Sequence, residues 1–240
     1  MKKEAETIQK MFARIAWRYD FLNHFLSLSF DRYWRKKAVR EVRLPEGGLV
    51  LDVCCGTGDM AIALHKTVRT ELASSPRVQV VGVDFCYEML QLAQEKVRKT
   101  RLPILFLQGD ALQLPFPDST FDTAMVAFGI RNVVDRKTGL IEMLRVIKPG
   151  GRLIVLEFYK PSLPLFSAFY LIYFRYVLPF LGRILSRDTR AYSYLPASVL
   201  EFYTPEEFGN LMIQAGCQEV QFRRLTGGIV AVHVGAKPGQ

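Results

Sequence analysis

Acidic residues recur through the first half of the sequence, each close to a short apolar run. They are Asp52, Asp59, Asp84 and Asp110. Three of them come at the end of an apolar run, and Asp59 opens the helical pattern that follows the first run. Runs of this kind, separated by helical patterns, are typical of parallel strands, whose carboxyl ends meet at the edge of a sheet where ligands bind. The sequence therefore predicts one acidic rim around one crevice.

A glycine-rich turn, LDVCCGTGDMA (51–61), connects the first run to its helix. Gly56 and Gly58 allow a tight turn and a close approach of the backbone to a ligand, because glycine has no Cβ. The turn also matches the loose GxGxxG/A pattern of dinucleotide sites, whose pyrophosphate binds the N-terminus of the following helix. Asp52 and Asp59 would repel a pyrophosphate, but they suit an ammonium and a sulfonium. Asp59 alone could be a helix cap, which leaves Asp52 unexplained, so NAD is disfavoured.

These charges fit S-adenosylmethionine, a cationic nucleoside with an amino-acid end. Asp84 can accept hydrogen bonds from both ribose hydroxyls, and an acceptor at Asp110, followed by Ala111, can meet the adenine amino group. Four acids at the carboxyl ends of three successive strands favour this cofactor over ordinary loop chemistry. We therefore predict a cofactor site formed by Asp52, Gly56, Thr57, Gly58, Asp59, Asp84, Asp110 and Ala111.

Strand and helix patterns alternate from Leu49 onward. Apolar runs at 49–54, 78–84, 103–110, 121–128 and 152–158 predict five strands, and helical spacing predicts helices at 59–68, 87–99, 135–147 and 205–216. This alternation implies a parallel, doubly wound sheet. QEVQFRRL and GGIVAVHVGAK then follow with only a turn between them, which predicts a terminal antiparallel β-hairpin. The predicted fold class is α/β, a single Rossmann-like class I S-adenosylmethionine-dependent methyltransferase domain over residues 1–240.

Two segments stand outside the alternating pattern. Residues 1–45 read as helices, and we predict that they form a lid. Residues 159–203 form an insert over the acceptor site, whose stretch 163–185 is very apolar and aromatic. It is a poor candidate for a membrane span, because Arg175 and two prolines interrupt it and a span needs about 20 apolar residues. An ordinary buried helix and a lipid-facing lid flanked by arginines both remain open.

The net charge of +9 is concentrated in these two segments. Residues 1–43 carry eleven Lys and Arg against five acids, and residues 158–203 carry five against two, whereas the rest of the chain is neutral. Two basic appendages indicate a polyanionic partner, either nucleic acid or an anionic membrane surface.

Cysteine and histidine usage indicates a reduced, intracellular setting without a metal site. The four cysteines show no CxxC spacing, and the three histidines are scattered along the chain. The first twelve residues are charged and lack the apolar core of a secretory signal.

Several motifs resemble a specific family, the C-methyltransferases of ubiquinone and menaquinone biosynthesis. The resemblance runs from Phe12 to Pro238 and rests on FARIAWRYDFLNHFLSLSFDRYWRK, FGIRNVVDR, YSYLPASVLEFYTPEEF and GGIVAVHVGAKP. KPGG and LPFPD are generic among methyltransferases. SLSFDRYW departs from the family's usual SLGxHRxW, because Ser29 replaces glycine and Asp31 replaces histidine.

The resemblance implies methyl transfer to a ring carbon of a reduced prenylated quinone. The adjacent Cys54 and Cys55 resemble the naphthoquinone branch, hence conversion of demethylmenaquinol to menaquinol, with a demethylphylloquinol or a ubiquinone precursor as alternatives. A prenylated quinol substrate and the basic segments predict a cytoplasmic protein held peripherally on the anionic inner face of the cytoplasmic membrane. A homodimer is left open.

The acceptor step requires a quinol hydroxyl to lose its proton, and a phenol-like pKa near 10 hinders this at neutral pH. A fixed cation beside the oxygen would stabilise the phenolate. We predict that Arg131 does so, directly or through water, that Asn132 orients the same oxygen, and that Tyr19 contacts it or relays the proton. The alternatives are a salt bridge from Arg131 to Asp135 or another acid of the rim, and simple aromatic packing of Tyr19. His24 and His233 are further conceivable bases.

Two other classes of protein fit parts of the sequence. An RNA or DNA methyltransferase would explain the positive charge, but the chain lacks an NPPY-type motif and a catalytic PC dipeptide, and its insert is apolar rather than basic. A lipid-binding module without catalysis would explain the insert, but it gives the acidic rim no function. We therefore expect no nucleic acid partner.

Overall fold

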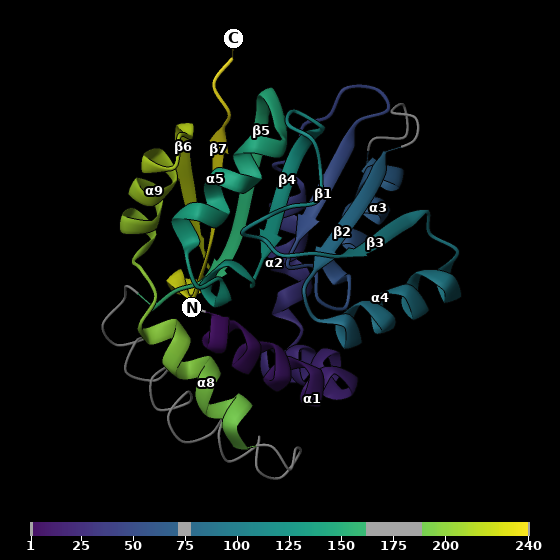
Figure 1. The fold of residues 1–240 in the computed structure, drawn as a ribbon, viewed down its shortest axis with the longest axis vertical. Helices are drawn as coiled ribbons and strands as arrows, with labels where there is room; N and C mark the ends of the chain where they lie inside the picture. The colour runs from purple at the N-terminus through teal and green to yellow at the C-terminus, as the bar shows by residue number, and fades with distance from the viewer. Residues whose placement is uncertain (1, 72–77, 162–188, 240) are drawn as a thin grey trace.

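Seven strands form one sheet in the computed structural model, which describes residues 2–71, 78–161 and 189–239 (Figure 1). The strands are β1 (Leu49–Val53), β2 (Gln79–Asp84), β3 (Ile104–Gln108), β4 (Phe121–Ala127), β5 (Ile147–Phe158), β6 (Gln218–Leu225) and β7 (Val230–Ala236), in the order β3-β2-β1-β4-β5-β7-β6. β1 to β5 run parallel, whereas β7 runs antiparallel to both β5 and β6. The predicted sheet of five parallel strands with a terminal hairpin is confirmed.

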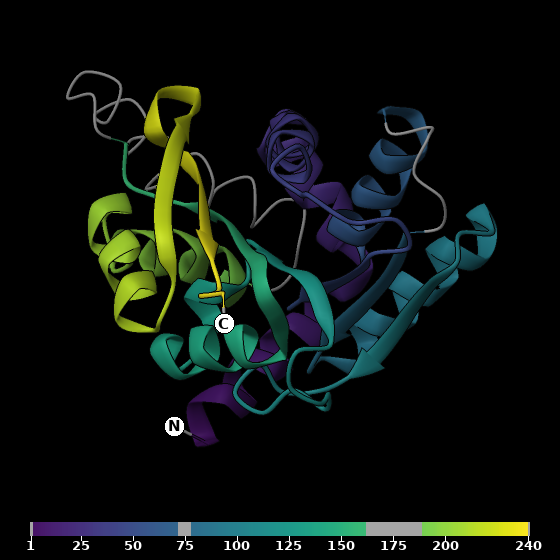
Figure 2. The same ribbon diagram turned by 90° about the horizontal axis from the view of Figure 1, so that it is seen from above.

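Helices cover both faces of this sheet (Figure 2). They are α1 (Lys2–Leu26), α2 (Phe30–Val39), α3 (Asp59–Glu71), α4 (Tyr87–Thr100), α5 (Arg136–Val146), α8 (Thr189–Leu200) and α9 (Pro205–Gln214), with short 3-10 turns η1 (Ile130–Asn132) and η3 (Thr226–Gly228). α2, α3 and α4 share one hydrophobic cluster, and α5 and α9 share a second. In β1, Val50 belongs to the first cluster and Leu51 to the second, because alternate strand residues face opposite sides of a sheet.

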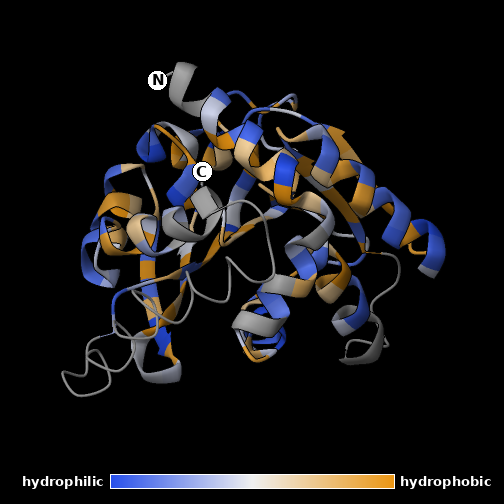
Figure 3. Cartoon of the chain, turned by 90° about the horizontal axis from the view of Figure 1, so that it is seen from below, coloured by the Kyte–Doolittle hydropathy of each residue, from blue (hydrophilic) through white to orange (hydrophobic). Residues whose placement is uncertain are grey.

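Strands that are buried on both faces explain the apolar runs in the sequence. Figure 3 shows the strands as mostly hydrophobic, whereas the helices carry hydrophilic residues as well. The fifth strand begins earlier than predicted, at Ile147 rather than Arg152, because Ile147 pairs with Phe121 before the chain turns at Gly150. Gly150 has a φ of +74°, a conformation that favours glycine.

The N-terminal segment is helical, as predicted, and its second helix is firmly packed. The buried Trp34 of α2 donates a hydrogen bond from its indole nitrogen to Thr226 Oγ1 (2.7 Å) and lies edge-on to the rings of Phe128 and Phe158. α1 and α8 lie across the carboxyl ends of the parallel strands (Figure 1). This placement brings both helices to the edge of the sheet where the sequence predicts a ligand.

The predicted insert is described only in part. Its apolar stretch 163–185 lies outside the described residues, so neither the buried helix nor the lipid-facing lid is tested. Its end forms α8, which contains Pro196. In the described ranges, no helix has the length and apolar character that crossing a membrane requires.

Candidate active site

A cavity lies at the carboxyl ends of β1, β2 and β4, and its wall also includes residues of α1 and α2. The space that it encloses, together with the open solvent at its mouth, is about 1090 Å³. Of the residues that the sequence predicts to bind cofactor or substrate, those that line it are Tyr19, Asp52, Gly56, Thr57, Asp59, Asp84, Asp110, Ala111 and Asn132. Gly58 and Arg131 do not line it.

The glycine loop between β1 and α3 explains why its two glycines differ. Gly56 has a φ of +54°, and a Cβ there would meet no atom within 4 Å, so the space beside it is open. A Cβ on Gly58 would lie 2.7 Å from Phe106 Cζ and 3.1 Å from Ala93 Cβ. Gly58 therefore permits close packing of the loop against β3 and α4, whereas Gly56 leaves room for a ligand.

The adjacent cysteines of this loop are structural. Cys54 has a φ of +54°, in the left-handed region that glycine favours, and its Cβ lies close to the backbone of Gly129. Burial raises the pKa of the Cys54 and Cys55 thiols well above the ordinary value. Both thiols are therefore protonated and poorly nucleophilic at neutral pH.

Asp52 and Asp84 are buried carboxylates in the wall of the cavity. Asp52 Oδ2 accepts a hydrogen bond from the Ala61 amide (3.0 Å), whereas its buried Oδ1 has no hydrogen-bond partner among the described residues. Burial raises the Asp52 pKa to about 7. Asp84 accepts from the amides of Gly56 and Cys86, both at 2.8 Å, and burial raises its pKa as well. An unpartnered buried carboxylate oxygen is suited to a bound cation.

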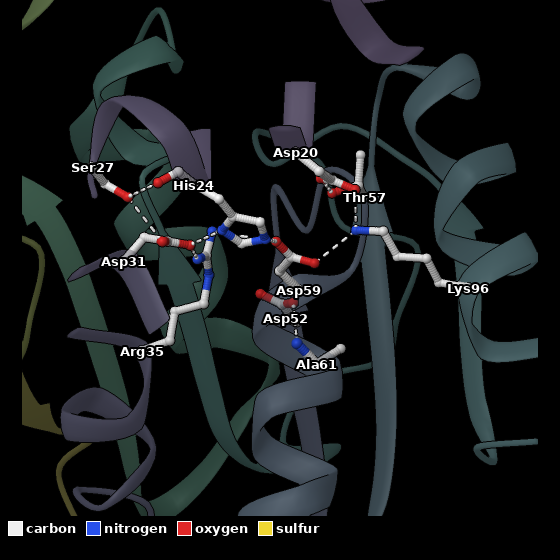
Figure 4. Close-up of polar contacts among 10 residues, drawn as sticks. All are labelled: Asp20, His24, Ser27, Asp31, Arg35, Asp52, Thr57, Asp59, Ala61 and Lys96. Atoms are coloured by element: carbon white, nitrogen blue, oxygen red, sulfur yellow. Dashed lines mark hydrogen bonds and ion pairs between the residues drawn. The ribbon is translucent and has the colours of Figure 1, made fainter. Parts of the chain in front are cut away.

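Asp59 is already paired with cations of the protein. Its Oδ1 accepts a hydrogen bond from Lys96 Nζ (2.7 Å), and its Oδ2 lies 3.8 Å from both His24 Nε2 and Arg35 Nη2 (Figure 4). Burial opposes ionisation, but Arg35 and Lys96 hold the pKa of Asp59 below its ordinary value. The sequence predicts Asp59 as a partner of the cofactor, and the structure gives it protein partners that the sequence does not reveal.

The same network fastens α1 to the glycine loop. Asp20 of α1 accepts a hydrogen bond from the Thr57 hydroxyl (2.5 Å) and forms an ion pair with Lys96 of α4 (2.5 Å) (Figure 4). Asp20 and Lys96 are far from the loop along the chain, so the sequence alone does not reveal that they contact it.

His24, Asp31 and Asp59 form a cluster that the sequence analysis does not foresee. One ligand atom from each lies within 4.8 Å of the others, a spacing that could hold a metal ion. The Arg35 guanidinium contacts Asp31 and lies beside Asp59, so it already supplies positive charge to both carboxylates. We therefore assign no metal to this cluster.

The predicted catalytic arginine lies directly behind the wall of the cavity, in a buried ion pair. Arg131 Nη1 donates to Glu157 Oε1 (2.7 Å) and to the Phe128 carbonyl (2.7 Å), and both charged side chains are buried. Arg131 therefore forms a salt bridge, the alternative that the sequence left open, and its partner is Glu157 at the end of β5. Asp135 instead caps α5, accepting from the Thr138 amide. Glu157 could have been identified from the sequence, because it is the acidic residue near the end of the fifth apolar run.

Tyr19 of α1 and Asn132 of η1 both line the cavity. Asn132 Oδ1 accepts a hydrogen bond from the hydroxyl of Tyr194 on α8 (2.9 Å). Burial raises the pKa of Tyr19, although the positive charge of nearby Arg131 opposes this shift. Tyr19 is therefore a neutral hydrogen-bond donor at physiological pH rather than a base.

His233, which the sequence analysis names as a conceivable base, lies away from the cavity. It is fully buried, its Nε2 lies 2.8 Å from the Pro205 carbonyl, and burial lowers its pKa to about 4. It packs between Phe208 and Phe222 in the core of the terminal hairpin.

The sheet order and the acidic glycine loop define a class I S-adenosylmethionine-dependent methyltransferase. The crystal structure of an S-adenosylmethionine-dependent methyltransferase from Thermotoga maritima shares this fold, with a TM-score of 0.67 at 23% identity over 95% of this chain and 99% of that chain. The model of the ubiE/COQ5 methyltransferase family matches residues 1–237, and the chain belongs to this family.

Relatives in this family match nearly the whole chain. A demethylmenaquinone methyltransferase from Deinococcus radiodurans is 46% identical over 234 residues, which cover 98% of this chain and 94% of that protein. The ubiquinone/menaquinone biosynthesis C-methyltransferase UbiE from Geobacter sulfurreducens is 46% identical over 241 residues, which cover 99% and 91%.

Proposed function

We propose that this methyltransferase transfers a methyl group from S-adenosylmethionine to a ring carbon of a reduced prenylated quinone precursor, converting demethylmenaquinol to menaquinol. The observation that carries the proposal is a single cavity that joins the acidic rim to Tyr19, Asn132 and apolar residues such as Phe128. The names of the relatives support the same substrate class. An RNA methyltransferase is disfavoured, because the relatives that match nearly the whole chain are named for quinone biosynthesis.

The residues present fit the proposed cofactor. When bound, S-adenosylmethionine supplies an electrophilic methyl group carried on a sulfonium. Asp52 offers a buried oxygen without a partner to the amino-acid ammonium, and the space beside Gly56 admits a ligand. Asp84 would accept from the ribose hydroxyls, and Asp110 and Ala111 would flank the adenine.

The acceptor side of the cavity supplies hydrogen bonding and electrostatics. Protonated Tyr19 would donate a hydrogen bond to the quinol oxygen as negative charge grows on it. Arg131 would strengthen this donor through its charge, and Asn132, held by Tyr194, would orient the same oxygen. Apolar walls would exclude water and hold the ring carbon near the methyl group.

Only the reduced form of the substrate is expected to be methylated, because only the quinol has an ionisable ring hydroxyl. Labelled S-adenosylmethionine would be supplied anaerobically with demethylmenaquinol, demethylphylloquinol and a ubiquinone precursor in parallel, each also in its oxidised form. We expect incorporation into the quinols, with demethylmenaquinol the best substrate. Equal incorporation into oxidised and reduced forms would refute the phenolate mechanism, and preference for another ring would reassign the substrate.

We also propose that the N-terminal helices rest on an anionic membrane surface. Large hydrophobic side chains are exposed on and between α1 and α2, namely Trp17, Phe21, Leu28 and Phe30. They lie in the strongly basic segment 1–43. We expect cosedimentation with phosphatidylglycerol vesicles that weakens as salt increases, and much weaker binding to phosphatidylcholine vesicles. Equal binding to both vesicles would contradict the electrostatic part of this proposal.

Cofactor affinity is expected to rise with pH through about 7, because Asp52 must ionise to face an ammonium. Because its folded-state pKa is about 7, about half of the free protein holds this proton at pH 7. Binding should therefore release up to about half a proton at pH 7, and up to about one proton at a pH well below 7. Calorimetry in two buffers of different ionisation enthalpy measures this release. Asp52→Asn should abolish it, and release that persists in this variant would assign the proton to another group.

A further inference from the structure

The cavity wall contains several acids but one basic side chain among the described residues, Arg35 of α2. The guanidinium is almost completely buried, and Lys96 and His24, which also approach Asp59, do not line the cavity. A buried charge in a ligand site costs free energy unless it is paired. Asp31 pairs with one end of the Arg35 guanidinium, so the other donors of Arg35 decide whether it can also bind an anionic ligand.

The guanidinium of Arg35 forms a hydrogen bond to a protein side chain through Nη1, and Asp59 lies near its other end (Figure 4). Its Nη1 donates to Asp31, which is itself fixed by the Ser27 hydroxyl (2.9 Å) and by His24 Nδ1 (2.8 Å). Its Cζ lies 5.5 Å from the centre of the Phe128 ring, which fixes the plane of the guanidinium. The donor that faces Asp31 is thus used for positioning.

The opposite edge of the guanidinium is not used in this way. Nε is buried and has no hydrogen-bond partner among the described residues, and Nη2 lies 3.8 Å from Asp59, beyond hydrogen-bond distance. Nε and Nη2 together form the side edge of an arginine, which donates two parallel hydrogen bonds to a carboxylate. Such a donor pair is a site for a planar anion.

We propose that Arg35 binds the carboxylate of the amino-acid end of S-adenosylmethionine through Nε and Nη2. The inference rests on the cofactor assigned above. That end carries both an ammonium and a carboxylate, and the acids of the rim can serve only the first. Arg35 thus pairs with the carboxylate of the cofactor, and Asp52 pairs with its ammonium. Because Arg35 belongs to α2, the cofactor also ties the N-terminal helices to the sheet.

Decarboxylated S-adenosylmethionine isolates this contact, because it keeps the sulfonium, the ammonium and the nucleoside but lacks the carboxylate. Calorimetric titration would compare both compounds on the wild type and on Arg35→Met. We expect the wild type to bind S-adenosylmethionine at least about tenfold more tightly than the decarboxylated compound, the scale of hydrogen bonds to charged groups. In Arg35→Met, affinity for S-adenosylmethionine should fall by about that factor, while affinity for the decarboxylated compound changes by less than about threefold.

Two further variants keep the test decisive. Arg35→Met/Asp31→Asn removes the cation together with its paired charge, so it should fold even if the single variant is unstable. It should show the same loss of discrimination between S-adenosylmethionine and the decarboxylated compound. Arg32→Met, on the exposed side of the same helix, should bind both compounds like the wild type. An equal loss of affinity for both compounds in the Arg35 variants overturns the proposal. A wild type that binds neither compound overturns the cofactor assignment itself.

Discussion

Replacing Glu157 with leucine is expected to lower the free energy of unfolding by about 3–5 kcal/mol, the usual cost of leaving one charge of a buried ion pair without its partner. Glu157 is fully buried, and its Oε1 accepts from Arg131 Nη1 (2.7 Å) and from the Phe158 amide (2.8 Å). The variant would bury the Arg131 guanidinium against apolar neighbours. Chemical denaturation followed by circular dichroism measures the effect.

The double variant Arg131→Met/Glu157→Leu serves as its counterpart. It removes both charges, so most of the lost stability should return. Glu46→Leu, an exposed acid in the loop before β1, should stay within about 0.5 kcal/mol of the wild type. A Glu157→Leu variant as stable as the wild type would show that the ion pair does not contribute to the fold.

The fold could be predicted because its signals are local. Each parallel strand is buried on both sides and reads as a short apolar run, and each helix that separates two strands shows its own spacing. The start of α9 can also be located in the sequence, because Thr204 and Glu207 form a capping box and Pro205 occupies the first turn. The early start of β5 could not be predicted, because it depends on pairing between Ile147 and Phe121 across the sheet.

The gathering of acids around one cavity could be predicted for a related reason. The carboxyl ends of parallel strands share one edge, so acids such as Asp52 and Asp84 meet there without any knowledge of long-range contacts. The partners of such charged residues could not be predicted from the sequence. Pairing of Asp20 with Lys96, and of Arg131 with Glu157, depends on how distant helices and strands pack. Gly58 shows the same limit, because its contact with Phe106 decides that it serves packing.

The ion pair limits how Arg131 could act in the proposed reaction. A guanidinium behind the cavity wall, held by Glu157 and the Phe128 carbonyl, cannot act as an isolated charge on the substrate. Its influence reaches the cavity through Tyr19, whose pKa it lowers against the opposing effect of burial. The hydroxyl of Tyr19 is therefore a stronger hydrogen-bond donor than burial alone would leave it.

Removal of the Arg131 charge is expected to lower kcat, but by less than the roughly hundredfold seen when a preorganised donor to a developing oxyanion is itself lost, because Tyr19 remains in place. Arg131→Ala and the double variant Arg131→Met/Glu157→Leu should both show it, with cofactor affinity nearly unchanged and the KM for the quinol changed less than kcat. Arg131→Lys keeps the charge but loses the planar fork, so it should restore activity only in part. Steady-state kinetics on the folded fraction measure these values.

Raising the pH should partly restore the kcat of the double variant, because bulk hydroxide then deprotonates the quinol, a step that Arg131 and Tyr19 would otherwise favour. The double variant separates catalysis from folding, since it removes the charge without leaving Glu157 unpaired. If it folds and turns over like the wild type, Arg131 serves the fold alone, and Tyr19 acts without it. If instead kcat falls while unfolding free energy is preserved, the positive charge behind Tyr19 contributes to the transition state for methyl transfer.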